Sequence, residues 1–221
     1  MVESSSLGTV CGACWGKLKP YEGILCSICG YPLPSIQREI LITRCGACRR
    51  QLYAFDFART WSLFEDPFKE IIHQFKYNHR RGLAFPLACR LVDLYGSRIV
   101  SFNIEGVIPV PLHQKRKSER GFNQSAELAR HFCRQTGLPF WETCLKRTRA
   151  TLVQAGLSRR ERRNNVRGAF EVPRGEKVVG KKILLVDDVF TTGVTLNECA
   201  SVLKKAGASR VAALTLARVV K

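Results

Sequence analysis

The stretch ILLVDDVFTTGVT, residues 183–195, places four apolar residues before two adjacent aspartates and a small, hydroxyl-rich turn. A short apolar run bounded by such a turn predicts a buried strand over residues 183–186, of the kind found in parallel sheets covered on both faces. Ligands of open α/β folds bind outside the carboxyl ends of the parallel strands. We therefore expect Asp187 and Asp188 at the mouth of a binding site.

The turn after this strand predicts a phosphate site. Residues 190–195 supply successive backbone N–H groups and three threonine hydroxyls at the start of a helix, where an anion is favoured. Gly193 has no Cβ, so the backbone can approach a ligand closely or take a positive φ. Because the two aspartates would repel the phosphate, they must face another part of the ligand. A ribose 5′-phosphate with a bound Mg²⁺ offers them the ribose hydroxyls and a cation. The alternative, a helix-capping turn, gives no reason for two adjacent acids.

Two other phosphate-binding patterns are excluded. The stretch GEKVVGKK, residues 175–182, resembles a P-loop, but Lys182 stands where a Ser or Thr should bind Mg²⁺, and the stretch precedes the strand. The dinucleotide pattern G-x-G-x-x-G does not occur in the sequence.

Apolar periodicity predicts an α/β domain around this strand. Phe68, Ile71, Ile72 and Phe75 fall on one helical face, in a helix that begins at Pro67 after Asp66. Further helices are expected over residues 83–95, 123–135 and 195–206, with Gly137 and Gly207 after the ends of the last two. Apolar strands are expected within residues 106–112 and 211–216. Strands that alternate with helices predict a parallel sheet covered on both sides.

The charge of the chain predicts anionic partners. The 221 residues include 36 Lys or Arg and 18 Asp or Glu, a formal net charge of +18. Phosphates, nucleic acid and acidic membranes are the candidate classes. No segment approaches the roughly 20 apolar residues of a membrane span, and the first residues lack the features of a secretory signal, so we expect a cytoplasmic protein without a membrane span.

Three Cys-x-x-Cys pairs within residues 11–48 predict a structural zinc module. Two such pairs complete a tetrahedral thiolate shell, so three pairs offer more ligands than one zinc needs, and either one pair is spare or two ions share ligands. Eleven residues separate the first pair from the second and fifteen separate the second from the third, and the shorter gap favours the first two pairs. A redox role would need a thioredoxin-like βαβ context, which this Gly- and Pro-rich region lacks. The candidate ligands are Cys11, Cys14, Cys26, Cys29, Cys45 and Cys48.

A basic segment lies in the middle of the chain. Residues 113–167 carry fourteen Lys or Arg against four Glu, and residues 147–167 show no clear period. We interpret the latter as a long excursion from the domain, with a solvated charged helix as the alternative.

Three stretches resemble a known family. ILLVDDVFTTGVT resembles the phosphoribosyl pyrophosphate signature of type I phosphoribosyltransferases. PVPLHQKRKSERGFNQS, residues 109–125, and RTRATLVQAGLSRRERRNNVRGAF, residues 147–170, are similar to the ComF family, in which a Cys-pair zinc module precedes the transferase-like domain. The resemblance implies a parallel-sheet type I phosphoribosyltransferase fold over residues 56–221, a zinc-ribbon-like module over residues 1–55 and a flexible hood around residues 147–167.

The resemblance also implies roles for the site residues. Asp187 and Asp188 would hold the ribose hydroxyls and Mg²⁺, and Arg116 and Arg120 would approach the pyrophosphate. In a longer, four-pair version of the module, the second and third cysteine pairs of this chain would share one zinc. The 5′-phosphate would be bound by Thr191, Thr192, Gly193, Val194 and Thr195.

Two functions follow as hypotheses. The first is a phosphoribosyltransferase that binds phosphoribosyl pyrophosphate with Mg²⁺ and transfers the phosphoribosyl group to an unidentified nitrogen acceptor. The second is a single-stranded DNA-binding protein of natural competence that uses the same fold without required catalysis. The implied partners are phosphoribosyl pyrophosphate, single-stranded DNA and other DNA-uptake proteins.

Overall fold

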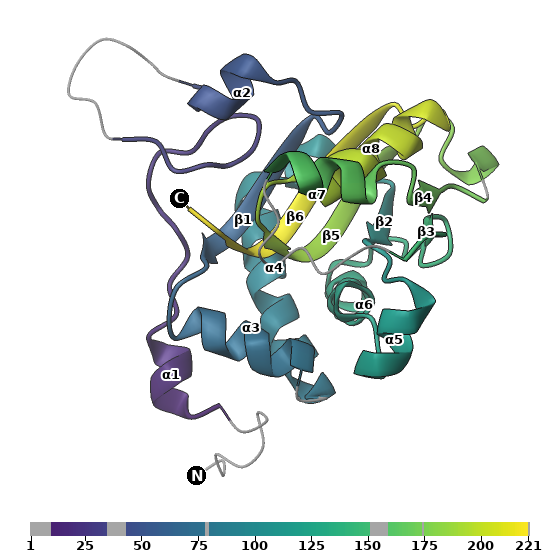
Figure 1. The fold of residues 1–221 in the computed structure, drawn as a ribbon. Helices are drawn as coiled ribbons and strands as arrows, with labels where there is room; N and C mark the ends of the chain where they lie inside the picture. The colour runs from purple at the N-terminus through teal and green to yellow at the C-terminus, as the bar shows by residue number, and fades with distance from the viewer. Residues whose placement is uncertain (1–9, 35–42, 78–79, 151–158, 174, 221) are drawn as a thin grey trace.

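The centre of the molecule is a four-stranded, all-parallel sheet in the order β1–β6–β5–β2 (Figure 1). The structure is a computed structural model that describes residues 10–34, 43–77, 80–150, 159–173 and 175–220. The all-parallel pairing of its strands confirms the expected parallel sheet with alternating helices. Its strands are β1 (Phe57–Leu63), β2 (Gly106–Pro109), β5 (Lys182–Phe190) and β6 (Arg210–Arg218).

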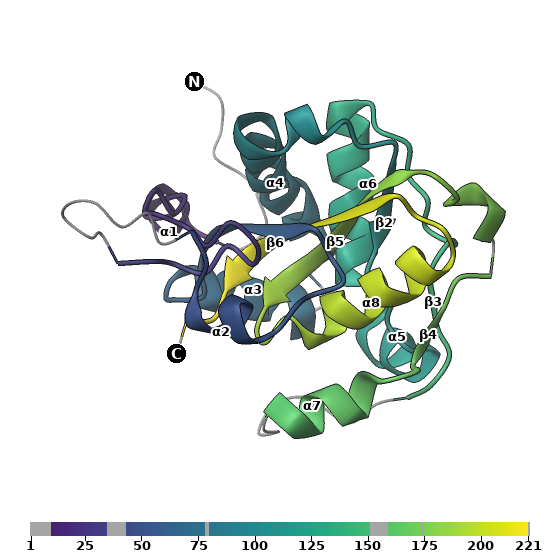
Figure 2. The same cartoon turned by 90° about the horizontal axis from the view of Figure 1, so that it is seen from above.

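Successive side chains of β5 enter two different cores. Ile183 and Leu185 join the core that also contains residues of helix α8 (Val194–Lys205). Leu184 and Val186 pack with helices α4 (Ala84–Arg98) and α6 (Gln124–Thr136). Figure 2 shows α4 and α6 on one side of the sheet and α8 on the other. An apolar run without alternation is what a strand buried on both faces requires.

The predicted helices form close to their expected bounds. Helix α3 (Phe68–Tyr77) buries the four apolar residues of the predicted face. The side chain of Asn123 accepts a hydrogen bond from the Ser125 backbone N–H at 3.1 Å and caps α6, and Gly137 closes that helix with φ +72°.

Two strands differ from the sequence-based prediction. Strand β1 is not predicted, because polar residues interrupt its apolar positions; one of them, Thr60, is buried with its Oγ1 atom 2.8 Å from Oγ1 of Thr215 on β6. Strand β5 continues four residues past Val186, since its pairing with β6 extends to Phe190 opposite Arg218. The two aspartates therefore lie within the strand and not after it.

The cysteine-rich segment packs on the sheet through β1. The Ala58 N–H donates to the Ile28 carbonyl oxygen at 2.7 Å, and cysteines of the segment share the apolar core beside α8. The short helices α1 (Gly12–Gly16) and α2 (Gly46–Arg50) belong to this segment.

Four further elements occur in the sequence between β2 and β5. They are helices α5 (Gln114–Arg120) and α7 (Arg159–Val166) and an antiparallel pair, β3 (Lys146–Arg147) with β4 (Phe170–Glu171). Part of the expected excursion is therefore helical, and its residues 151–158 lie outside the described residues. Single 3₁₀ turns occur at Arg81–Leu83, Val100–Phe102 and Gly175–Lys177. Over the described ranges, no helix has the length and apolar character needed to cross a membrane.

Candidate ligand site and cysteine cluster

The sheet topology places a cavity between the carboxyl ends of β2 and β5. The first long helix after β2, α6, covers one face of the sheet, whereas the helix after β5, α8, covers the other, so the two connections diverge. Such a switch point is where open α/β sheets bind ligands. A cavity of about 290 Å³ opens there, lined by residues that include Val110, Pro111 and Leu112 after β2 and Asp187 to Phe190 at the end of β5.

Asp187 and Asp188 both line this cavity. Oδ1 of Asp187 accepts hydrogen bonds from the Ser125 hydroxyl at 2.8 Å and from the Asp188 N–H at 2.9 Å. Asp188 is buried, and its Oδ1 lies 3.0 Å from Nζ of Lys76. Burial and the neighbouring Asp188 carboxylate raise the pKa of Asp187 to about 7. The pair is therefore a concentrated negative charge in a poorly solvated place, which a cation would stabilise.

The turn after the aspartates has the geometry of an anion cradle. Gly193 takes φ +74° at the start of α8, and a Cβ there would lie 2.4 Å from the Phe190 ring, so only glycine fits. Thr191, Gly193 and Thr195 line the cavity, whereas Thr192 and Val194 belong to the same turn but do not line it. Within the described residues, the buried Oγ1 of Thr192 has no hydrogen-bond partner.

Arginines contribute the cationic part of the lining. Arg116 and Arg120 reach the cavity from α5, and Arg147 reaches it from β3. Arg120 lies 4.8 Å from the ring centroid of Tyr77 and donates to the Tyr77 hydroxyl at 3.3 Å. Burial, followed by the nearby Arg116 charge, lowers the pKa of Arg147. Positive charges gathered in this way favour a polyanionic ligand.

Several lining residues were not predicted as site residues. Gln124 and Ser125 lie within the quoted stretch 109–125, and Arg147 begins the stretch 147–170, so both motifs contained the signal. Lys76 and Tyr77 follow the apolar face of α3 and carry no sequence signal of their own.

Four cysteines form a second candidate site, away from the cavity. The Sγ atoms of the cluster lie within 4.8 Å of one another, and all four residues are buried. Sγ of Cys29 lies 3.7 Å from Sγ of Cys45, close to the edge of about 3.8 Å that tetrahedral zinc with Zn–S bonds of about 2.3 Å requires. The hydrogen bond between Cys26 and Cys29 lowers the pKa of the Cys26 thiol to about 3 and raises that of Cys29, while burial raises the pKa of Cys48, so Cys26 is the thiolate of the set without a metal. The ligand set and spacing fit a structural zinc site at Cys26, Cys29, Cys45 and Cys48.

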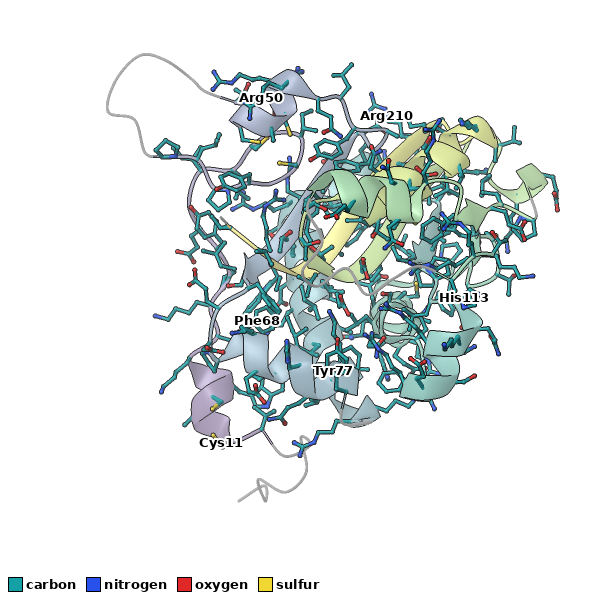
Figure 3. All side chains as sticks on the ribbon, in the orientation of Figure 1. Cys11, Arg50, Phe68, Tyr77, His113 and Arg210 are labelled. Atoms are coloured by element: carbon teal, nitrogen blue, oxygen red, sulfur yellow. The ribbon has the colours of Figure 1, made fainter. Side chains whose placement is uncertain are left out.

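The first cysteine pair is not part of this cluster. Cys11 and Cys14 belong to the turn of α1, and Figure 3 shows Cys11 at the opposite end of the segment from Arg50 on α2. The structure brings together the second and third pairs, which the longer gap separates. The Ser27 N–H, within the second pair, donates to the carbonyl oxygen of Thr43, just before the third pair, at 2.7 Å and so joins the two ends of that gap.

Comparison with known proteins relates the chain to two groups. Residues 119–220 match the family described as the phosphoribosyl transferase domain. Competence protein F of Haemophilus influenzae is 30% identical over 95% of this chain and 90% of its own length. DNA utilization protein YhgH of Escherichia coli K12 is 32% identical over the same shares, and competence protein ComFC of Bacillus subtilis is 28% identical over 95% of this chain and 84% of its own.

Solved structures show a more distant likeness. Glutamine phosphoribosylpyrophosphate amidotransferase from B. subtilis aligns with 64% of this chain at 21% identity and a TM-score of 0.44, and the aligned part spans 30% of that protein.

Proposed function

This chain belongs to the ComF family of phosphoribosyltransferase-like proteins, and from that premise we propose that it binds phosphoribosyl pyrophosphate with Mg²⁺ at the carboxyl ends of β2 and β5. The observation that carries the proposal is one cavity lined by an aspartate pair of which Asp188 is buried and Asp187 half-buried, a glycine-containing turn at a helix start and three arginines. Its volume of about 290 Å³ is near the lower end of the roughly 300–1,000 Å³ typical of ligand pockets.

Each part of the ligand has a matching part of the cavity. The 5′-phosphate binds the backbone N–H groups of residues 191–195 and the hydroxyls of Thr191 and Thr195, where α8 begins. Asp187 and Asp188 face the ribose hydroxyls and hold Mg²⁺, for which carboxylate oxygens are the preferred protein ligands. Arg116 and Arg120 contact the pyrophosphate, whose charge the bound Mg²⁺ helps to neutralise.

The reaction proposed for this site is transfer of the phosphoribosyl group to a nitrogen nucleophile. The C1′–O bond to pyrophosphate breaks as a C1′–N bond forms, so negative charge accumulates on the leaving group. Arginines that already face the cavity stabilise that charge without rearrangement. The contribution of this chain is thus positioning and electrostatics.

Calorimetric titration of the zinc-loaded protein with phosphoribosyl pyrophosphate tests the proposal. We expect micromolar binding that requires Mg²⁺ and that weakens at least about tenfold in Asp187→Asn, because one carboxylate is lost. Asp93→Asn, a change of an exposed aspartate on α4, is the matched control and should bind normally. Undiminished affinity in Asp187→Asn would refute the assignment of the aspartates.

A second function, binding of single-stranded DNA during DNA uptake, is favoured by the net charge of +18 and by the relatives named for competence and DNA utilization. It requires no catalysis and is compatible with the first. Helix α7 contributes four arginines to this charge over eight residues. Electrostatic binding of this kind predicts a strong dependence on salt.

A further inference from the structure

Arg218, the last residue of β6, is a buried charge that the cavity does not use. Its side chain lies against the cysteine cluster: Nη1 donates to the Cys29 carbonyl oxygen, and Nη2 lies 3.5 Å from Sγ of Cys29. The residue is only 6% exposed, and a buried guanidinium is destabilising unless nearby negative charge balances it. Zinc held by four thiolates carries a net charge of two minus, so the occupied cluster supplies that balance.

On its other side Arg218 meets the phosphate-binding turn. The guanidinium carbon lies 4.1 Å from the ring centroid of Phe190, a stacking distance. Gly193 lies against the same ring, as the 2.4 Å approach of a Cβ there to Cζ of Phe190 shows. One aromatic ring therefore separates Arg218 from the turn, and any movement of that ring changes the space available to Gly193.

The chain that follows Cys48, the last cysteine of the cluster, makes a second connection to the turn at residues 191–195. Residues 51–56 follow α2, which carries Cys48. The Tyr53 hydroxyl donates to the Thr192 carbonyl oxygen at 3.4 Å, and the Ala54 N–H donates to Oδ1 of Asn197 on α8 at 2.8 Å. The ring of Phe55 meets that of Phe190 edge-on at 6.2 Å.

We propose that Arg218 is a positioning residue that links the cysteine cluster to the phosphate-binding turn, so that zinc at the cluster and a phosphorylated ligand at the turn strengthen each other's binding. Arg218 touches Cys29 and Phe190 and does not line the cavity, so it acts on the ligand only through Phe190 and Gly193. The ligand half of this inference rests on the proposed function. Coupling of this kind is reciprocal, because both ligands draw on the same free energy.

Hydrogen exchange measured by mass spectrometry tests the link without phosphoribosyl pyrophosphate. We compare the zinc-loaded full chain with Arg218→Met, which keeps a long apolar stem and removes the charge. We expect Arg218→Met to keep its zinc, since all four cysteines remain, and its amides at residues 191–195 to exchange about tenfold faster. Arg210→Met, at the other end of β6, is the matched control and should exchange like the wild type, as should α4 in every variant.

Phe190→Leu is the second variant and decides the matter if Arg218→Met does not fold. It leaves Arg218 and the cysteines in place and removes only the ring that joins them to Gly193. It should also keep zinc and exchange faster at residues 191–195. Exchange at wild-type rates in a folded, zinc-loaded Arg218→Met or Phe190→Leu protein would overturn the inference.

The rate of zinc transfer to an added chelator tests the reciprocal effect. Phosphoribosyl pyrophosphate with Mg²⁺ should slow zinc loss from the wild type about tenfold and leave the rate in Arg218→Met unchanged. Equal slowing in both proteins would overturn the coupling. If calorimetry shows that the wild type binds no phosphoribosyl pyrophosphate, the proposed function fails, while the exchange experiment still decides whether the cluster positions the turn.

Discussion

Asp187 and Asp188 place two carboxylates near the carboxyl end of a central strand, where the charge of Asp187 opposes folding and where we propose that the pair serves a ligand. Hydrogen bonds from Ser125 and from the Asp188 N–H hold Asp187, and Lys76 holds Asp188. These partners compensate only partly, because the pKa of Asp187 remains raised to about 7. Sites that bind charged ligands commonly sacrifice stability in this way.

We expect Asp187→Asn to stabilise the protein at pH 8. An aspartate has a pKa of about 3.9 when unfolded, so between that value and about 7 the folded state binds more protons and stability falls as pH rises. Above pH 7 the penalty is fully present, and removing the charge should raise the free energy of unfolding by on the order of 2 kcal/mol. Urea unfolding without added Mg²⁺ should show this gain at pH 8 and little difference at pH 4.

Asp93→Asn controls for the loss of one charge and should show no such pH dependence. An Asp187→Asn protein that is less stable than the wild type at pH 8 would contradict the argument. The expected combination, a more stable protein that binds its ligand less well, would separate a functional carboxylate from a structural one.

Gly193→Ala should impair the ligand site more than an equally strained substitution elsewhere. Gly193 and Gly137 have nearly the same φ, +74° and +72°, but a Cβ meets the Phe190 ring at Gly193 and open space at Gly137. Gly137→Ala should lower the free energy of unfolding by about 1–2 kcal/mol, the cost of a left-handed alanine, and Gly193→Ala should lower it further because the Phe190 ring must also move. Only Gly193→Ala should also weaken phosphoribosyl pyrophosphate binding, by about tenfold or more in calorimetry. Equal affinities in the two variants would mean that the turn tolerates displacement.

Whether the sequence predicted that two residues lie at the same site depended on how far apart they are in the chain. The aspartates and the threonine-rich turn occupy one stretch of thirteen residues, and a local pattern was sufficient to predict that the aspartates line a cavity near the carboxyl end of β5, although it ended the strand four residues too early. Lys76, Ser125 and Arg218 reach their partners from other elements, and nothing near them in the sequence indicates the contact. Contacts between residues that are distant in the sequence can be identified only once the fold is known.

At the scale of elements, apolar periodicity was reliable for helices and less so for strand bounds. Helices α3 and α6 were predicted from one buried face and their capping residues. Strand β1 was missed because its pairing with β6 stabilises polar positions that carry no apolar signal. The end of β5 was placed too early for the same reason, since strand pairing does not depend on whether Asp187 is apolar.

Helix α6 is joined to the 3₁₀ turn before α4 by the carboxylate of Glu127, whose effect on stability should depend on pH. Glu127 is 8% exposed and accepts from Arg81 at 2.7 Å and from Arg130 at 2.6 Å. Burial acts to raise the pKa of Glu127, but the two arginines outweigh it and the pKa is lowered overall. A glutamate with a lowered folded pKa stabilises the protein above its unfolded pKa of about 4.3, and the effect is lost as pH falls through the folded pKa.

Glu127→Gln should therefore lower the free energy of unfolding at pH 7 by about 1–3 kcal/mol, with the difference shrinking as the pH falls below about 4. Glu142→Gln is the matched control, because Glu142 contacts the same Arg130 at 3.1 Å but its side chain is 42% exposed. It should change stability by less than about 1 kcal/mol. Urea titrations from pH 3 to 8 measure both. A pH-independent cost for Glu127→Gln would show that packing, and not charge, fixes this contact.

At the scale of the whole molecule, a zinc-type cluster and a ligand cavity share one apolar core. The cluster cysteines, Phe55 and Phe190 all belong to the core beside α8, so the N-terminal module is part of the framework of the site. The sequence predicted a module and a domain, but not that Tyr53 and Ala54, which follow the cysteine cluster in the chain, would contact Thr192 and Asn197 at the start of α8. Cysteine spacing alone favoured the first two pairs, because chain separation carries no information about the fold that closes the longer gap.

The net charge of +18 is the other property of the whole molecule, and it leads to a test of single-stranded DNA binding. Replacing the four arginines of α7, Arg159, Arg160, Arg162 and Arg163, by alanine should weaken binding to a single-stranded oligonucleotide. Each lost phosphate contact reduces the slope of log affinity against log salt by about 0.7, so the slope should fall by up to about 3. Fluorescence anisotropy at several salt concentrations measures it.

A control with the same loss of charge separates position from total charge. Lys69, Arg98, Lys205 and Arg210 are exposed and dispersed over the molecule, and replacing all four by alanine also lowers the net charge by four. If α7 is part of the DNA footprint, its variant should lose more affinity and more slope than this control, because phosphate contacts act at short range while the overall charge acts through a screened field. An unchanged slope in the α7 variant would remove that helix from the footprint, and equal changes in both variants would mean that net charge alone attracts the DNA.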